Sequence, residues 1–259
     1  MNGLLEIVIL ALPLLLTAGL AFLNFLVFFK NYRQIEEITM LHIAITFLLG
    51  ASIFVLVFIA VLVPQTYQLQ LFLITNMFVW LLFLEVGNSY LSAFLNRSWE
   101  IERYLLPIFG AAIGSSALVA IKPDIYLLEI ALNIELLVYF LAIISLLYIF
   151  IRAIIRINSV LDQFEGEELK LLELTQLIFL LGSICAGFTF ITCFTWVVIK
   201  GVHNLSLNIA TWELIDWLTY LNLPMYTGIL LGALLRSLKI EFDQIDVPTI
   251  LNVLDSPQE

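Results

Sequence analysis

The sequence predicts an all-α integral membrane protein, a bundle of seven transmembrane helices with its N-terminus outside the cell and its C-terminus in the cytoplasm. Of its 259 residues, 62% are hydrophobic, against about 45–50% in soluble domains. These residues gather in seven long stretches, and the basic residues lie between the stretches. The predicted helices cover residues 4–29, 38–63, 69–95, 104–121, 126–151, 171–199 and 213–235.

Each stretch is long enough to cross a hydrocarbon core of about 30 Å as an α-helix. The first stretch could be mistaken for a signal peptide. It lacks a basic leading segment, however, it is too long, and Lys30 and Arg33 follow it. We therefore expect it to be retained as the first helix. Pro224 lies inside the seventh stretch and should kink that helix near Tyr220, because proline has no backbone N–H to donate.

The basic residues predict the orientation. Of the eleven Lys and Arg residues, two, Lys122 and Lys200, lie in one set of alternate connections, and the other nine lie in the opposite set and the C-terminal segment. The positive-inside rule then places the N-terminus outside and makes the chain a multi-pass protein of the cell membrane. The nine are Lys30, Arg33, Arg97, Arg103, Arg152, Arg156, Lys170, Arg236 and Lys239.

The longest cytoplasmic connection, 152–170, is predicted to prolong the fifth helix, to break near Gly166 and to start the sixth helix. It mixes acidic residues with apolar ones that need cover from the membrane surface or from a partner protein. Its acids disfavour anionic lipid, so we expect a cytoplasmic protein partner here. The apolar residues are Ile155, Ile157, Val160, Leu161 and Phe164.

The remaining organisation is simple. The bundle occupies residues 1–236, and a short acidic cytoplasmic tail occupies 237–259, which is too short for a folded output domain. The net charge of −10 resides mostly in the loops and the tail, so nucleic acid is not an expected partner, whereas the lipid bilayer is. The sequence does not predict an oligomeric state.

Neither a cofactor nor a metal is expected. The two cysteines, Cys185 and Cys193, lie about 12 Å apart on one helix, too far for a disulfide. The two histidines are too few for a bis-haem or a zinc cluster. No nucleophile–base pair can be assembled, so we expect no enzymatic activity.

Polar residues inside the spans are the informative ones, because they are costly there. On the third helix, Glu85 shares a face with Asn88, Ser89 and Ser92. It lies about 18 Å along the helix from Arg97, which predicts a position near mid-bilayer. No Lys or Arg within the spans can pair with it. We therefore expect it to be protonated, bound to a cation or amine, or wetted by a cavity; the structural alternative is a neutral acid hydrogen-bonded to Asn or Ser.

Polar and aromatic residues on several spans predict an outward-facing pocket. For Asp216 near the outer surface, simple interfacial solvation is the alternative. The predicted ligand-binding residues are Trp80, Glu85, Glu135, Tyr139, Trp196, Asp216 and Tyr220. Small-residue pairs predict close helix packing within the monomer, with dimerisation as the alternative. These pairs are Gly110 with Gly114, Ser183 with Gly187, and Gly228 with Gly232.

The segment 80–85, WLLFLE, followed by a basic turn and then Pro107 early in the fourth helix, resembles the seven-helix input region of some membrane histidine kinases. The similarity in topology covers about residues 1–235, and the motif covers 80–107. The resemblance implies a sensor-like module. No kinase follows the seventh helix, so the module would act through a separate partner. The hypotheses are therefore a receptor-like or sensory module, a small transporter or ion-conducting protein that uses Glu85, and a non-catalytic structural subunit of a membrane complex.

Overall fold

The computed structural model describes residues 2–63, ten positions between 71 and 86, 125–200 and 207–255. All the secondary structure in these ranges is helical. The elements are α1 (Asn2–Ile35), α2 (Ile38–Leu62), α5 (Ile125–Val160), the 3-10 turn η1 (Leu161–Gln163), α6 (Gly166–Lys200), α7 (Leu207–Ser237), the 3-10 turn η2 (Phe242–Gln244) and α8 (Val247–Asp255).

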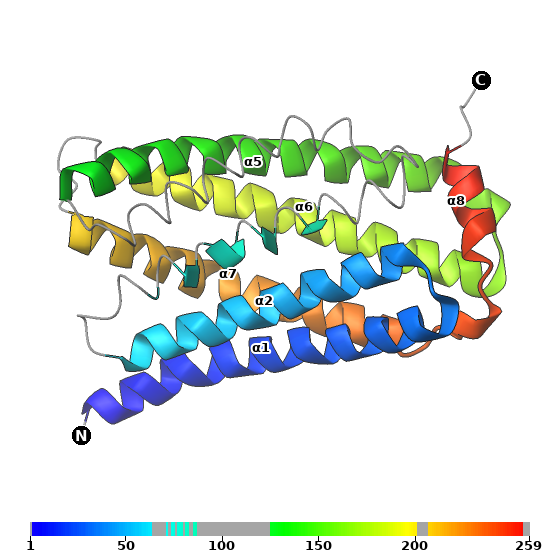
Figure 1. The fold of residues 1–259 in the computed structure, drawn as a ribbon, viewed down its shortest axis with the longest axis horizontal. Coiled ribbons are helices and arrows are strands. Elements are labelled where there is room, and N and C mark those ends of the chain that lie inside the picture. Colours follow the sequence, from blue (N-terminus) through cyan, green and yellow to red (C-terminus); the bar gives the residue numbers. More distant parts are fainter. Residues whose placement is uncertain are drawn as a thin grey trace.

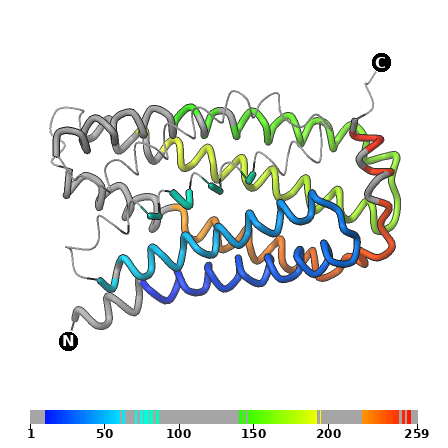
Figure 2. The backbone as a smooth tube through the Cα atoms, in the orientation of Figure 1, coloured from blue at the N-terminus to red at the C-terminus, as the bar shows by residue number. Residues whose placement is uncertain are grey.

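The five long helices of the described chain lie side by side in an elongated bundle (Figure 1). α1 pairs with α2, α5 pairs with α6, and α7 packs between α6 and α1. The short helix α8 lies across one end of the bundle, where the α1–α2 and α5–α6 connections also lie. We call this the capped end. The tube in Figure 2 shows the same arrangement of the backbone, and α1 begins at the opposite end of the bundle (Figure 1).

Within the described residues, three helical segments are long and apolar enough to cross a membrane: Ala11–Ile35, Ile38–Ala60 and Gly166–Ile191. The predicted spans 126–151 and 213–235 also fall on helices, α5 and α7. The described positions of span 69–95 are helical, and span 104–121 lies outside the described residues. Large apolar side chains such as Leu12, Leu16 and Ile191 are 58–66% exposed, which is compatible with contact with lipid.

The helix ends follow local backbone chemistry. α1 stops at Glu36, which has a φ of +59°, an uncommon left-handed conformation for a residue with a side chain. The N–H of Glu36 donates to the carbonyl of Tyr32 at 2.7 Å and closes the last turn. At the other connection, α5 continues to Val160, and α6 starts at Gly166, whose φ is +64°. The predicted extension of the fifth helix and the break near Gly166 are therefore confirmed.

Polar groups join α1 to α7. Thr17, Asn24 and Asn31 are spaced by seven residues, which places them on one face of α1, and all three are buried. The hydroxyl oxygens of Thr17 and Thr227 lie 2.6 Å apart and share a hydrogen bond. The amide nitrogen of Asn24 donates to the carbonyl of Leu230 at 2.9 Å. Hydrogen bonds of this kind stabilise the packing of neighbouring membrane helices, and here they connect α1 to α7.

The tail is folded onto the capped end. After α7, the chain turns at η2 and buries Phe242, which is 4% exposed and whose ring contacts Phe28 of α1 edge-on at 6.2 Å. α8 follows and buries Ile250 and Leu254. The apolar side chains of this acidic segment therefore belong to the same core as α1, α5 and α6.

Candidate functional site

Glu85 contacts a histidine. Its Oε2 lies 2.8 Å from Nδ1 of His42 on α2, and the side chains of His42 and Glu85 are 24% and 19% exposed. His42 is neither a Lys or Arg, the basic partners considered for Glu85, nor an Asn or Ser, the neutral ones, and it was not predicted. His42 could have been recognised from the sequence as a candidate functional residue, because it lies inside the predicted second span, where polar residues are rare. The structure joins α2 to the third predicted span through an ionisable pair.

The pair lies near the capped end. His42 is four residues after the start of α2 at Ile38, or about 6 Å along the helix. The contact therefore places Glu85 beside the first turns of α2. Its depth in the bilayer stays a prediction.

Two hydroxyls flank the pair along α2. Thr39, His42 and Thr46 share one helical face at spacings of three and four residues. The hydroxyl of Thr46 donates to the carbonyl of His42 at 2.9 Å. The hydroxyl of Thr39 is buried without a hydrogen-bond partner. The face of α2 that carries His42 is therefore polar for two helical turns.

A second polar group lies between α6 and α7. The hydroxyls of Thr189 and Tyr226 lie 3.0 Å apart, and the ring of Tyr226 contacts Phe54 of α2 edge-on. One turn before Tyr226, Asn222 is completely buried, and neither its Oδ1 nor its Nδ2 has a hydrogen-bond partner. Burying an unpaired amide is costly. This residue, which the sequence analysis does not single out, lies two positions after the predicted ligand-binding residue Tyr220.

The structure describes no side-chain contacts for the other predicted ligand-binding residues. Trp80 lies outside the described residues. The remaining five lie on described helices, α5, α6 and α7, but their side chains lie outside the described part: they are Glu135, Tyr139, Trp196, Asp216 and Tyr220. The outward-facing pocket stays a prediction.

Among the described residues, close packing is not seen at three glycines of the predicted pairs. A Cβ built at Gly187, Gly228 or Gly232 would meet no heavy atom within 4 Å, whereas one at Gly182 would lie 3.1 Å from Cε2 of Phe150. The tight contact thus lies between α6 and a ring of α5, at the residue that precedes Ser183. The pair Gly110–Gly114 lies outside the described residues.

Within the described ranges, no group of three or more His, Cys, Asp or Glu residues could hold a metal ion. Cys185 is a buried free thiol in α6. Comparison with known proteins adds no assignment: no family model, curated protein or solved structure matches this sequence.

Proposed function

We propose that this protein is a receptor-like sensory module of the cell membrane, built on seven transmembrane helices, which signals through a separate cytoplasmic partner. In this proposal the capped end faces the cytoplasm. The described basic residues at that end support this orientation through the positive-inside rule. They are Lys30, Arg33, Arg152, Arg156, Lys170, Arg236 and Lys239.

The contact between His42 and Glu85 is the observation that carries the proposal. An imidazole can be neutral or protonated, so its bond to a carboxylate can be neutral or charged. When the imidazole is charged, its bond to a carboxylate is charge-assisted and stronger than the neutral bond. A proton on His42, or a cation or amine bound to Glu85, therefore changes the attraction between α2 and the third span. Many protein switches work in this way: a local change in charge shifts the balance between two arrangements of packed helices.

The unpartnered amide of Asn222 supports the outward-facing pocket. Asn222 lies fourteen residues before Arg236 on α7, or about 21 Å along the helix, which corresponds to the outer half of the bilayer. Asp216 and Tyr220, two predicted pocket residues, precede it on the same helix. An amide offers both a donor and an acceptor, so Asn222 is suited to form the inner end of a pocket for a small polar ligand.

The full chain in lipid nanodiscs tests the sensory proposal. Hydrogen exchange in α2 and at the capped end should be faster in His42→Gln and in Glu85→Gln than in the native chain, because glutamine keeps hydrogen-bonding capacity but cannot form a charge-assisted bond. Exchange that is unchanged in both variants would contradict the role of the pair.

The proposed orientation has its own test in intact cells. A single cysteine placed at Asn204 should react with an impermeant reagent from outside, and one placed at Ser159 should not. The reverse pattern would invert the topology.

A small proton- or ion-coupled transporter is the second candidate. The specific observation in its favour is that polar groups occur at two depths, with His42 and Glu85 near the capped end and Asn222 farther out. In liposomes loaded with a pH-sensitive dye, a transporter would carry protons down an imposed gradient, and Glu85→Gln would stop the flux. Faster hydrogen exchange in the His42→Gln and Glu85→Gln variants, without any flux, would favour the sensory module.

A further inference from the structure

The surface beneath α8 is apolar and belongs to the connection between α5 and α6. Ile157, Val160 and Phe164, whose side chains are at most 5% exposed, form part of it. α8 packs against α5 and buries Ile250 and Leu254 in the same core. Three of the five apolar residues that were predicted to need cover are thus buried in one core with the chain's own tail, whereas Ile155 stays 64% exposed.

The same surface carries a hydrogen-bond donor for a helix end. Nε of Arg156 donates to the carbonyl of Leu254 at 2.8 Å, and its Nη2 donates to the carbonyl of Val253 at 3.3 Å. The last carbonyls of a helix have no partner within the helix, and a cation is favourable at that end. The surface therefore recognises a short helix by its apolar side chains and by its C-terminal carbonyls.

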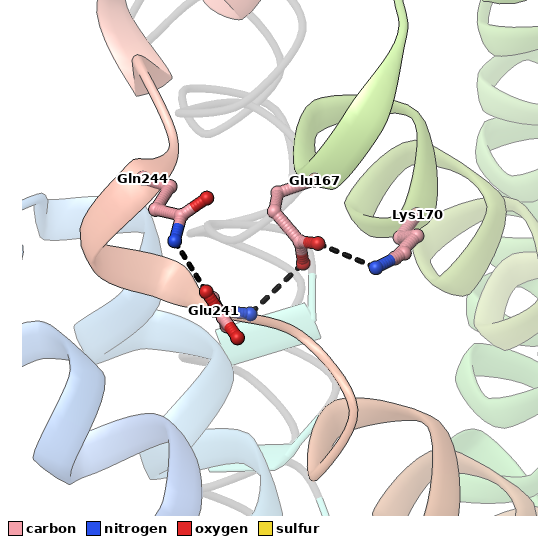
Figure 3. A network of polar contacts seen from close by, with 4 residues as sticks. All are labelled: Glu167, Lys170, Glu241 and Gln244. Atoms are coloured by element: carbon pink, nitrogen blue, oxygen red, sulfur yellow. Dashed lines mark hydrogen bonds and ion pairs between the residues drawn. The ribbon is translucent and has the colours of Figure 1, made fainter.

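The chain before α8 is tethered separately. Glu167, in the first turn of α6, accepts a hydrogen bond from the backbone N–H of Glu241 at 2.9 Å and is ion-paired with Lys170, and Gln244 contacts the Glu241 carboxylate (Figure 3). Phe242 is inserted into the core beside this network. The tail is thus anchored before α8 begins at Val247, and α8 can leave without releasing η2.

α8 is poorly able to stay helical without this surface. It has nine residues, whereas isolated helices shorter than about 12–15 residues are marginal in water. Asp246 caps its start: its Oδ1 accepts a hydrogen bond from the backbone N–H of Thr249 at 3.4 Å, and its Oδ2 accepts one from the Thr249 hydroxyl at 2.6 Å. A single cap does not overcome the cost of nucleation. We expect α8 to open as a local unit while the bundle stays folded.

We infer that the surface beneath α8 is the docking site for the signalling partner and that α8 occupies it when the partner is absent. The partner would present a short amphipathic helix with apolar side chains four residues apart, as Ile250 and Leu254 are, and would place its last carbonyls on Arg156. The exposed acids Asp162 and Glu165 beside the surface disfavour an anionic membrane as the occupant. This inference rests on the proposed sensory function, which requires a separate partner.

A labelled peptide with the sequence of residues 245–255 tests the docking site on the full chain in nanodiscs. The double variant Ile250→Ser/Leu254→Ser weakens α8 and leaves the surface intact, so it should bind the peptide at least tenfold more tightly than the native chain does. Adding Arg156→Gln should reverse most of this gain. Equal binding to the native chain, to the double variant and to empty nanodiscs would mean lipid adsorption and would overturn the inference, as would the absence of binding to all three.

Hydrogen exchange on the unmodified chain provides a second measurement that needs no variant. Amides of residues 250–255 should exchange at least a hundredfold faster than those of 152–160. Equal protection would mean that α8 never leaves the surface and would refute the inference. If His42→Gln and Glu85→Gln still changed exchange in α2 in that case, the sensory proposal would stand and the docking site alone would fail.

Discussion

Replacing Asn222 by leucine should stabilise the bundle, whereas the same change at Asn24 should destabilise it. Both side chains are completely buried. The amide of Asn222 has no hydrogen-bond partner, and an unpaired buried amide costs about 1–3 kcal/mol in mutational series. Leucine has the same branching at Cγ and no polar atom, so Asn222→Leu should raise the free energy of unfolding by about 1–2 kcal/mol where the larger methyl groups are accommodated.

Asn24 is the matched control. Its Nδ2 donates to the carbonyls of Leu20 and Leu230, both at 2.9 Å. Interhelical hydrogen bonds in membrane proteins are worth about 0.6 kcal/mol on average and up to about 1.7. Its Oδ1 has no partner, which offsets part of the loss. We expect Asn24→Leu to lower the free energy of unfolding by about 1 kcal/mol.

The assay is reversible unfolding in mixed detergent micelles, followed by tryptophan fluorescence and circular dichroism, for the native chain and both variants. The two changes should have opposite signs. If Asn222→Leu destabilised the bundle as much as Asn24→Leu, the amide of Asn222 would have a water or ligand partner in the folded protein, and our reasoning from an unpaired group would be refuted.

Two further predictions concern the backbone. Gly182→Ala should destabilise the bundle by about 1 kcal/mol, because the new Cβ would lie 3.1 Å from the ring of Phe150. The control Gly187→Ala should be neutral or stabilising by up to about 1 kcal/mol. Equal shifts of the melting temperature in the two variants would contradict the packing of α5 on α6. Glu36→Gly should stabilise the protein by about 0.5–1 kcal/mol, because φ at Glu36 is +59°. Glu37→Gly, at a φ of −81°, should not raise the free energy of unfolding measured by chemical denaturation. An increase at both positions would rule out backbone strain as the cause.

The length of each continuous apolar stretch predicts the long described helices well. The extension of α5 to Val160 and the break at Gly166 are also predicted, since the amphipathic pattern and a glycine are both local signals. The fold of the tail is not predicted. Its acids suggest a solvated segment, whereas the spacing of Phe242, Ile245, Ile250 and Leu254 is what buries it.

The candidate site is predicted less well, because it depends on which helices meet. Glu85 is recognised by its cost inside a span, but its contact with His42 needs α2 beside the third span. The regular spacing of Thr17, Asn24 and Asn31 could have been recognised from the sequence, since seven residues bring side chains to one face. The lack of a hydrogen-bond partner for Asn222 depends on which side chains surround it in the folded chain, and this cannot be read from the sequence.

The bonding of α1 to α7 has a consequence for biosynthesis. Thr17 and Thr227 are separated by 210 residues, and a ribosome adds about 5–20 residues per second. The first helix therefore waits roughly 10–40 s for its partner, with Thr17 and Asn24 unable to make these bonds. A chaperone or the insertion machinery that shields this face of α1 would raise the yield of correctly assembled protein. Production in cells should thus depend more on the rate at which the last helix arrives than on the hydrophobicity of the first.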